Sequence, residues 1–181
     1  GLVHAHVRCE MMACLAIDAE TYNARTEIES KAALNFSTAM HHVDTIVRRW
    51  PNDHPRIIID RHGGKIRYRN ELQLCWPEAH IQILTEEPSR SRYRLRFGES
   101  LATITFASKS DEHHFPVALA SMIAKYTREL QMIRLNRYFA GMMPELKPTA
   151  GYVTDGRRFL KEIEPLLANN GINRDDLIRT S

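Results

Sequence analysis

Short apolar runs along the chain alternate with longer segments in which apolar residues recur every three or four positions. Residues 2–17 begin with alternating polar and apolar residues and end apolar, which predicts one long or two short strands. Residues 56–60 contain three consecutive isoleucines, a run typical of a buried strand. Residues 92–97 and 101–106 alternate on either side of Gly98-Glu99-Ser100, and this arrangement predicts a β-hairpin.

Helical spacing dominates the segments between these runs. Thr26 and Glu29 resemble a capping box, and the apolar residues after them are spaced for a helix that ends before Trp50. The same patterns predict the remaining elements, which are a short helix within 66–75, a strand at 81–84, a long helix from about 115 and a last helix over 155–167. Strands that alternate with helices indicate an α/β layer fold.

The composition is that of an ordinary globular protein, with 181 residues of which 43% are hydrophobic and 26% charged. We expect one main domain over residues 1–150 and a small helical extension over 151–181. The longest apolar run, Met11–Ile17, is too short to cross a bilayer, so no membrane association is expected. The three cysteines lack zinc-site spacing and favour a reduced, cytoplasmic protein. A net charge of +3 permits a nucleic-acid partner without requiring one.

Two aspartates occupy positions at which α/β sheets build their sites. Asp60 closes the predicted isoleucine strand, and Asp111 stands just before the long helix. A carboxylate pair of this kind suits Mg²⁺ or Mn²⁺, because hard cations prefer oxygen ligands. The pair taken alone is a weak signal and also fits an Asp111 that caps a helix and an Asp60 that faces a loop.

Four motifs surround these aspartates in a fixed order. They are Ile57-Ile-Ile-Asp60 followed by Gly63-Gly64, then Ser108-Lys-Ser-Asp111, then Pro116-Val-Ala-Leu-Ala-Ser-Met-Ile-Ala-Lys-Tyr-Thr-Arg128, and finally Ala150-Gly-Tyr-Val-Thr-Asp155. Their order and intervals resemble those of the ribonuclease HII family. The resemblance implies a ribonuclease H-like mixed sheet flanked by helices.

The chain also departs from the pattern of that family. The family site has four carboxylates, and the first two come from an Asp-Glu-x-Gly-Arg-Gly motif that this chain lacks. The resemblance therefore implies a sheet that is incomplete at its N-terminal edge, with the first strands either upstream of Gly1 or lost. Such an edge leaves open a homodimer, because unpaired strand edges attract other strands. The hairpin at 92–106 looks like an insertion.

The resemblance implies metal-dependent hydrolysis of the RNA strand in RNA–DNA hybrids, or at a ribonucleotide embedded in DNA, by a two-metal mechanism with Mg²⁺ or Mn²⁺. Asp60 and Asp111 match metal-binding catalytic carboxylates of the family. Ser121 and Lys125 match residues near the substrate strand, and Tyr152 matches the tyrosine that senses the ribonucleotide junction. With two carboxylates instead of four, we expect the isolated chain to be slow or inactive. Two alternatives remain open: a non-catalytic nucleic-acid-binding or assembly module, and a purely structural domain.

Basic residues form two groups that could contact phosphates. Arg61, Lys65, Arg67 and Arg69 directly follow Asp60, next to the expected site. Arg92, Arg94 and Arg96 share one face of a predicted strand, because strand side chains alternate. Each group either binds nucleic-acid phosphates or forms an ordinary solvated surface.

Overall fold

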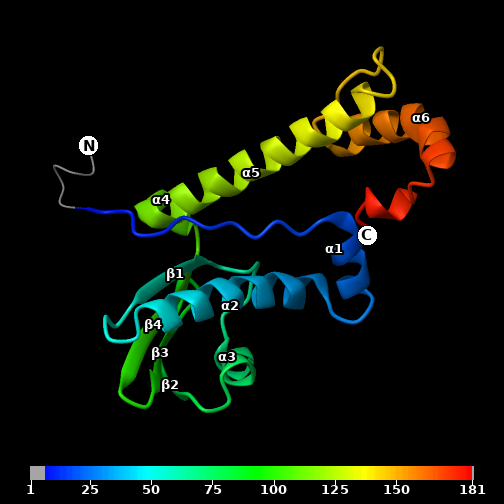
Figure 1. Ribbon diagram of the computed structural model, residues 1–181. Helices are drawn as coiled ribbons and strands as arrows, with labels where there is room; N and C mark the ends of the chain where they lie inside the picture. Colours follow the sequence, from blue (N-terminus) through cyan, green and yellow to red (C-terminus); the bar gives the residue numbers. More distant parts are fainter. Residues whose placement is uncertain (1–6, 181) are drawn as a thin grey trace. The chain divides into compact units, whose positions relative to one another are not determined.

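A computed structural model describes residues 7–180 (Figure 1). The described chain divides into two compact units, one of residues 29–121 and one that joins the residues up to 28 with those from 122 onward. The domain boundary expected at residue 150 remains a prediction, and it does not coincide with this division. No helix in the described part of the chain is both long enough and apolar enough to cross a membrane.

A four-stranded mixed sheet forms the centre of the unit 29–121. Its spatial order is β1-β4-β3-β2, and its strands are β1 (Arg56–Asp60), β2 (His80–Glu86), β3 (Arg90–Phe97) and β4 (Ser100–Ala107). β1 runs parallel to β4, and the other neighbours are antiparallel. The predicted α/β class and the hairpin are therefore confirmed. Gly98 turns the hairpin with φ +58°, a left-handed conformation that glycine adopts without steric cost.

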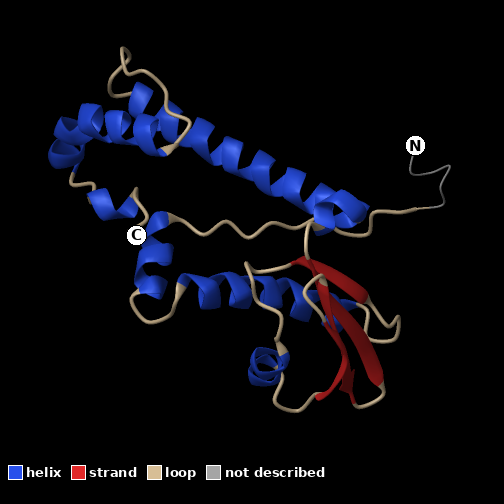
Figure 2. Cartoon of the chain, turned by 180° about the vertical axis from the view of Figure 1, so that it is seen from behind, coloured by secondary structure: helices blue, strands red, loops and turns tan. Residues whose placement is uncertain are grey.

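Helices α2 (Lys31–Arg49) and α3 (Arg69–Cys75) bury one face of this sheet. Figure 2 shows the sheet from the other side, with the strands in front of α2. The core is rich in aromatic residues: the rings of Tyr68 and Phe106 stack with centroids 3.7 Å apart, and Tyr93 meets both edge to face. The rings of Tyr68 and Phe106 also lie about 6 Å from the ring of His62, so the core contacts the segment that follows Asp60.

The outer edge of β1 pairs with no strand among residues 7–180. This agrees with the expectation of a sheet that is incomplete at that edge, while the homodimer through it stays a prediction. The strand expected over residues 2–17 is wrong for the part described, because residues 7–18 form neither strand nor helix, and residues 2–6 lie outside the described residues. Several apolar side chains in this segment are exposed to solvent, among them Val7 (49%) and Met12 (64%).

Helix α2 begins later than the capping box predicts. Its N-cap is Ser30, whose hydroxyl accepts a hydrogen bond from Ala33 N at 3.1 Å. Thr26 instead ends helix α1 (Ala19–Thr26), where its hydroxyl donates to the carbonyl of Tyr22 at 2.9 Å. The expected cap is wrong because Thr26 is already used inside a preceding helix that the apolar pattern did not reveal.

The second unit is helical. It contains α1, most of the long helix α5 (Phe115–Ala140), α6 (Val153–Asn170) and the short 3₁₀ helix η2 (Arg174–Asp176). Phe139 on α5 packs against Phe159, Ile163 and Leu167 on α6, and all four side chains are buried. The side-chain amide of Asn23 on α1 donates to the carbonyls of Asp175 and Ile178, which attaches α1 to the segment around η2. Both long helices expected after residue 115 are therefore present.

Candidate metal and nucleic-acid site

Asp60 ends β1, and its carboxylate is fixed by the turn that follows β4. Its Oδ1 accepts hydrogen bonds from Ser110 N at 3.1 Å and from Ser110 Oγ at 3.0 Å. Ser110 is fully buried, so both donors stay in place. β1 and β4 are parallel, and Asp60 lies beside Ala107, the last residue of β4. Ser110, three residues later, is therefore close enough to bind Asp60.

Asp111 follows Ser110 in the four-residue helix α4 (Ser110–His113), rather than in an open loop before the long helix. Its side chain is exposed and makes no hydrogen bond or ion pair with any residue between 7 and 180. The two aspartates therefore lie at the carboxyl ends of neighbouring parallel strands, joined through Ser110. The structure brings together the two segments that the sequence singled out.

A strained backbone residue introduces this helix. Lys109 caps α4 with φ 52° and ψ 40°, the left-handed conformation, which costs an L-residue about 1–2 kcal/mol. The conformation turns the chain sharply between the end of β4 and Ser110. Such strain persists where the surrounding structure holds the segment in place, here through the bonds between Ser110 and Asp60.

The segment after Asp60 packs into the aromatic core. The ring of His62 lies about 6 Å from those of Phe36, Tyr68 and Phe106, and its backbone N–H donates to the Tyr68 hydroxyl at 3.2 Å. Burial lowers the pKa of His62, with a smaller opposing effect from the Asp60 carboxylate. The neutral imidazole is favoured, so His62 contributes little positive charge beside Asp60.

Two of the basic residues predicted to contact phosphates are already engaged. The guanidinium of Arg61 donates to the carbonyl of Pro88 in the turn between β2 and β3. Lys65 forms an ion pair with Glu71 and lies 5.5 Å from the centre of the Tyr68 ring. A phosphate at either side chain would compete with these contacts. Arg67 and Arg69 are exposed, and Arg67 makes a longer ion pair with Glu86, at 3.9 Å.

The remaining predicted residues lie further along the chain. Ser121 is half-buried on α5 in the sheet unit, whereas Lys125 is exposed one turn later, in the helical unit. Their separation of four residues places both on one face of the helix. Tyr152 belongs to the helical unit, and 67% of its side chain is exposed.

Tyr152 stands on a loop that is tied to α5. The guanidinium of Arg128 donates to the carbonyl of Ala150 and lies 4.9 Å from the centre of the Tyr152 ring. Gly151 has φ +73°, and a Cβ there would approach the side chain of Met132 to 3.1 Å. Only glycine fits this position without strain, so the Gly-Tyr pair fixes where the aromatic ring is presented.

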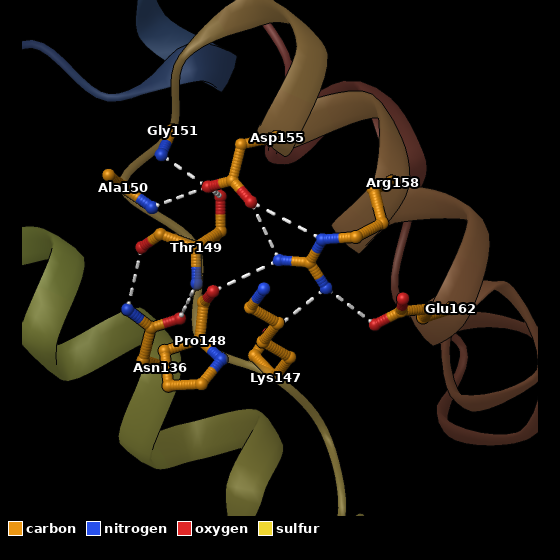
Figure 3. A network of polar contacts seen from close by, with 9 residues as sticks. All are labelled: Asn136, Lys147, Pro148, Thr149, Ala150, Gly151, Asp155, Arg158 and Glu162. Carbon is orange, nitrogen blue, oxygen red and sulfur yellow. Dashed lines mark hydrogen bonds and ion pairs between the residues drawn. The ribbon is translucent and has the colours of Figure 1, made fainter.

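A polar network also holds the same loop (Figure 3). The Asp155 carboxylate accepts hydrogen bonds from Thr149 Oγ1 at 2.7 Å and from Ala150 N at 2.8 Å. Arg158 binds Asp155 and the carbonyls of Lys147 and Pro148. Hydrogen bonds from Arg158, Thr149 and Ala150 lower the pKa of Asp155 to about 2. Asn136 on α5 pairs with the backbone of Thr149, so the network joins α5 to α6.

The donor set at Asp60 and Asp111 fits a hard divalent cation. Nowhere in residues 7–180 do three or more histidine, cysteine, aspartate or glutamate side chains gather as a metal cluster. Mg²⁺ nevertheless binds commonly through one or two carboxylates, with waters and substrate phosphates as further ligands. Oδ1 of Asp60 is occupied by Ser110, whereas its Oδ2 and the Asp111 carboxylate make no hydrogen bond or ion pair with the described residues.

Ser110 is the residue that sequence reasoning missed. It lies between Lys109 and Asp111 in a motif that the sequence did identify, but nothing in its type marks it as buried or as a partner of Asp60. Only the parallel pairing of β1 with β4 places it there. The sequence also gave no sign of the role of Arg128, which contacts Tyr152 from a position 24 residues earlier in the chain.

Comparison with known protein families finds a match. Residues 66–173 match the family model described as ribonuclease HII, and this segment is more than half of the chain. Searches of curated proteins and of solved structures returned no match. The matched segment includes Asp111, Ser121, Lys125 and Tyr152 and begins shortly after Asp60.

Proposed function

The chain belongs to the ribonuclease HII family, and from this premise we propose that it is a metal-dependent endonuclease domain acting on the RNA of RNA–DNA hybrids or on a ribonucleotide embedded in DNA. Asp60 and Asp111 are the proposed metal-binding catalytic residues. The single observation that carries the proposal is the pair of hydrogen bonds from Ser110 to Asp60, because they join the two motifs at one end of the sheet.

Asp60 and Asp111 would together hold two Mg²⁺ or Mn²⁺ ions, as in two-metal hydrolases. When bound, such ions activate a water and stabilise the leaving oxygen of a phosphodiester. The protein itself contributes orientation: Ser110 fixes one oxygen of Asp60 and leaves the other available. Asp111, in the first turn of α4, has no competing protein partner among the described residues.

Recognition of the substrate falls to the remaining residues. Arg61, Lys65, Ser121 and Lys125 are proposed to contact the nucleic-acid strands. The exposed ring of Tyr152 is proposed to pack on the sugar at the ribonucleotide junction, where the 2′-OH distinguishes RNA from DNA. The fixed loop from Thr149 to Gly151 supports this role, since a ring held in one place discriminates better than a mobile one. The three free, exposed cysteines support a reducing, cytoplasmic location as part of the proposal.

The test is cleavage of a labelled duplex that contains one ribonucleotide, with the 181-residue chain in excess and Mn²⁺ present. We expect slow cutting at the ribonucleotide, which Asp60→Asn and Asp111→Asn each abolish. Hybrid binding should persist in both variants or strengthen slightly, because each removes one negative charge near the phosphates.

Tyr152→Ala provides a second readout in the same assay. We expect it to reduce the preference for the ribonucleotide over plain DNA. Cutting that survives Asp60→Asn would place the chemistry elsewhere and refute the proposal. Hybrid binding without any cutting under these conditions would instead identify a nucleic-acid-binding module.

A further inference from the structure

One face of the sheet carries a row of arginines that the proposed site does not use. Arg90, Arg92, Arg94 and Arg96 alternate along β3 with side chains of the hydrophobic core, such as Tyr93 and Leu95. They therefore all point to the face opposite the one that α2 and α3 bury. β3 lies between β2 and β4, so this row crosses the middle of the sheet.

Strand register places Asp60 on this same face. Arg90 pairs with Ala107 of β4, which pairs in turn with Asp60 of β1. Likewise Arg94 pairs with Thr103, which pairs with Arg56. Residues paired across neighbouring strands project to the same side of a sheet. Arg56 thus joins the row, and these five residues are called the arginine face: Arg56, Arg90, Arg92, Arg94 and Arg96.

The charges of the arginine face are not balanced within the protein. None of its five residues forms an ion pair with any residue from 7 to 180. Arg94 makes a long contact of 3.5 Å with Gln82, and its Nε is buried without a hydrogen-bond partner among the described residues. The residues interleaved with the arginines on this face are mostly uncharged, and include Thr103, Thr105 and Gln82. Asp60, at the end of β1, is the acidic residue that the register places beside them.

An uncompensated positive surface of this kind raises the local concentration of polyanions. Guanidinium groups also bind phosphate through paired N–H donors, which gives them geometric as well as electrostatic selectivity. Neighbouring members of the row are two residues apart on a strand, or about 6.8 Å. Phosphates of one strand rise by about 3.4 Å per nucleotide along the helix axis, and the winding of the backbone separates them further, so successive arginines can meet successive phosphates.

We propose that the arginine face binds the sugar-phosphate backbone of the same nucleic acid whose scissile bond lies at Asp60. The inference rests on the proposed function for the identity of the substrate, and on the register of the sheet for the path that the strand follows. The backbone runs from Asp60 past Arg90 and along β3. This contact depends on the phosphate charge and not on the sugar or the base, so we expect an RNA–DNA hybrid and a DNA duplex to bind the arginine face with similar affinity.

The experiment measures binding of an RNA–DNA hybrid to the full 181-residue chain in EDTA, over salt concentrations from about 50 to 200 mM. The variant Arg92→Gln/Arg96→Gln removes two charges from the arginine face. We expect its affinity to be about tenfold lower near 100 mM salt, and the slope of log affinity against log salt to decrease by about 1.8, which is about 0.9 for each lost phosphate contact. Binding of a DNA duplex should weaken by the same factor.

Two matched variants separate this role from a general effect of charge or folding. Lys31→Gln/Arg49→Gln removes two charges from α2, on the opposite side of the sheet, and should leave the slope unchanged. Arg92→Lys/Arg96→Lys keeps both charges and should retain most of the affinity. A thermal melt of each variant reports folding independently of binding.

The outcomes also distinguish this inference from the proposed function. If the α2 variant weakens binding as much as the β3 variant, the arginine face is not a specific contact, while cutting that depends on Asp60 still supports the proposed function. If the β3 variant has the affinity and the salt slope of the parent chain, the arginine face does not contact the nucleic acid and the inference is wrong. If the parent chain neither binds nor cuts a hybrid, both proposals fail together.

Discussion

The carboxylate of Asp60 depends on one residue, Ser110, for both of its hydrogen bonds with the described part of the chain. Ser110 is fully buried, and its two bonds to Asp60 hold the left-handed backbone of Lys109 in place. The serine hydroxyl and backbone N–H thus act together as a clamp on the end of β1. A metal ligand is more effective when a neighbouring group fixes its orientation, so this clamp supports the proposed role of Asp60 in cation binding.

Ser110→Ala should test this clamp directly. Loss of the hydroxyl removes one of the two bonds to Asp60, and we expect the free energy of unfolding to fall by about 1 kcal/mol. Mn²⁺ binding, measured by calorimetry, should weaken by roughly 10-fold or more because the carboxylate is less well oriented. The matched control is Ser108→Ala, since the Ser108 hydroxyl makes no hydrogen bond with the described residues. Equal metal binding in both variants would show that Ser110 has a packing role alone.

Between α5 and α6 the chain forms a loop whose conformation is set by side chains rather than by backbone pairing. Asp155 in the first turn of α6 accepts from Thr149 and Ala150, and Arg158 one turn later binds two carbonyls of the same loop. A negatively charged residue in the first turn is also favoured by the helix dipole. Tyr152 therefore lies at the start of α6, next to a loop that the ionised side chains of Asp155 and Arg158 stabilise.

The pH dependence of this boundary follows from the pKa of Asp155. That pKa is about 2 in the folded protein, below its ordinary value of 3.8, so the ionised carboxylate stabilises the fold. The stabilisation is complete above about pH 4 and is lost as the pH falls through 2. We expect Asp155→Asn to be less stable than the parent at pH 5 to 7, with the difference shrinking toward zero near pH 2. Urea unfolding at several pH values would measure it, and a pH-independent difference would contradict the assignment.

At the scale of the whole molecule, the described residues form two separate hydrophobic cores. One lies between the sheet and helices α2 and α3, and includes Leu95. The other lies between α5 and α6, and includes Ile163. Both of these side chains are fully buried, and each core is made from residues of its own compact unit. The stability of the Asp60 site and that of the Tyr152 loop therefore depend on different packing.

Core truncations should reveal this division. Leu95→Ala and Ile163→Ala each remove a buried aliphatic side chain, which costs about 2–5 kcal/mol. We expect Leu95→Ala to reduce hydrogen-exchange protection mainly in residues 29–121, and Ile163→Ala to reduce it mainly from residue 122 onward. Ala168→Gly, at an exposed position on α6, serves as a mild control for helix propensity. Equal loss of protection throughout the chain for either truncation would show one cooperative core instead.

The local pattern of apolar and polar residues was sufficient to predict most of the helices and strands. The isoleucine run of β1, the alternation of β3 and β4 around Gly98, and the spacing of α5 each reflect interactions within a few residues, and all of them are present. The ribonuclease HII resemblance rested instead on the order of four motifs, and the family match over residues 66–173 confirms it. Cap choice was less secure, because Thr26 and Ser30 both suit a helix start and only the preceding helix α1 decides between them.

Long-range pairing decided the rest. The apolar residues from Val7 to Ile17 look like a strand, yet a strand needs a partner, and these residues pair with no described strand. The sequence determined that Asp60 ends a buried strand and that arginines alternate along β3. Tertiary structure alone determined that Ser110 binds Asp60 and that the arginines share its face. The physical reason is that β1 and β4 are neighbours in space but far apart in the chain, so the residues of neither strand indicate which strand it pairs with.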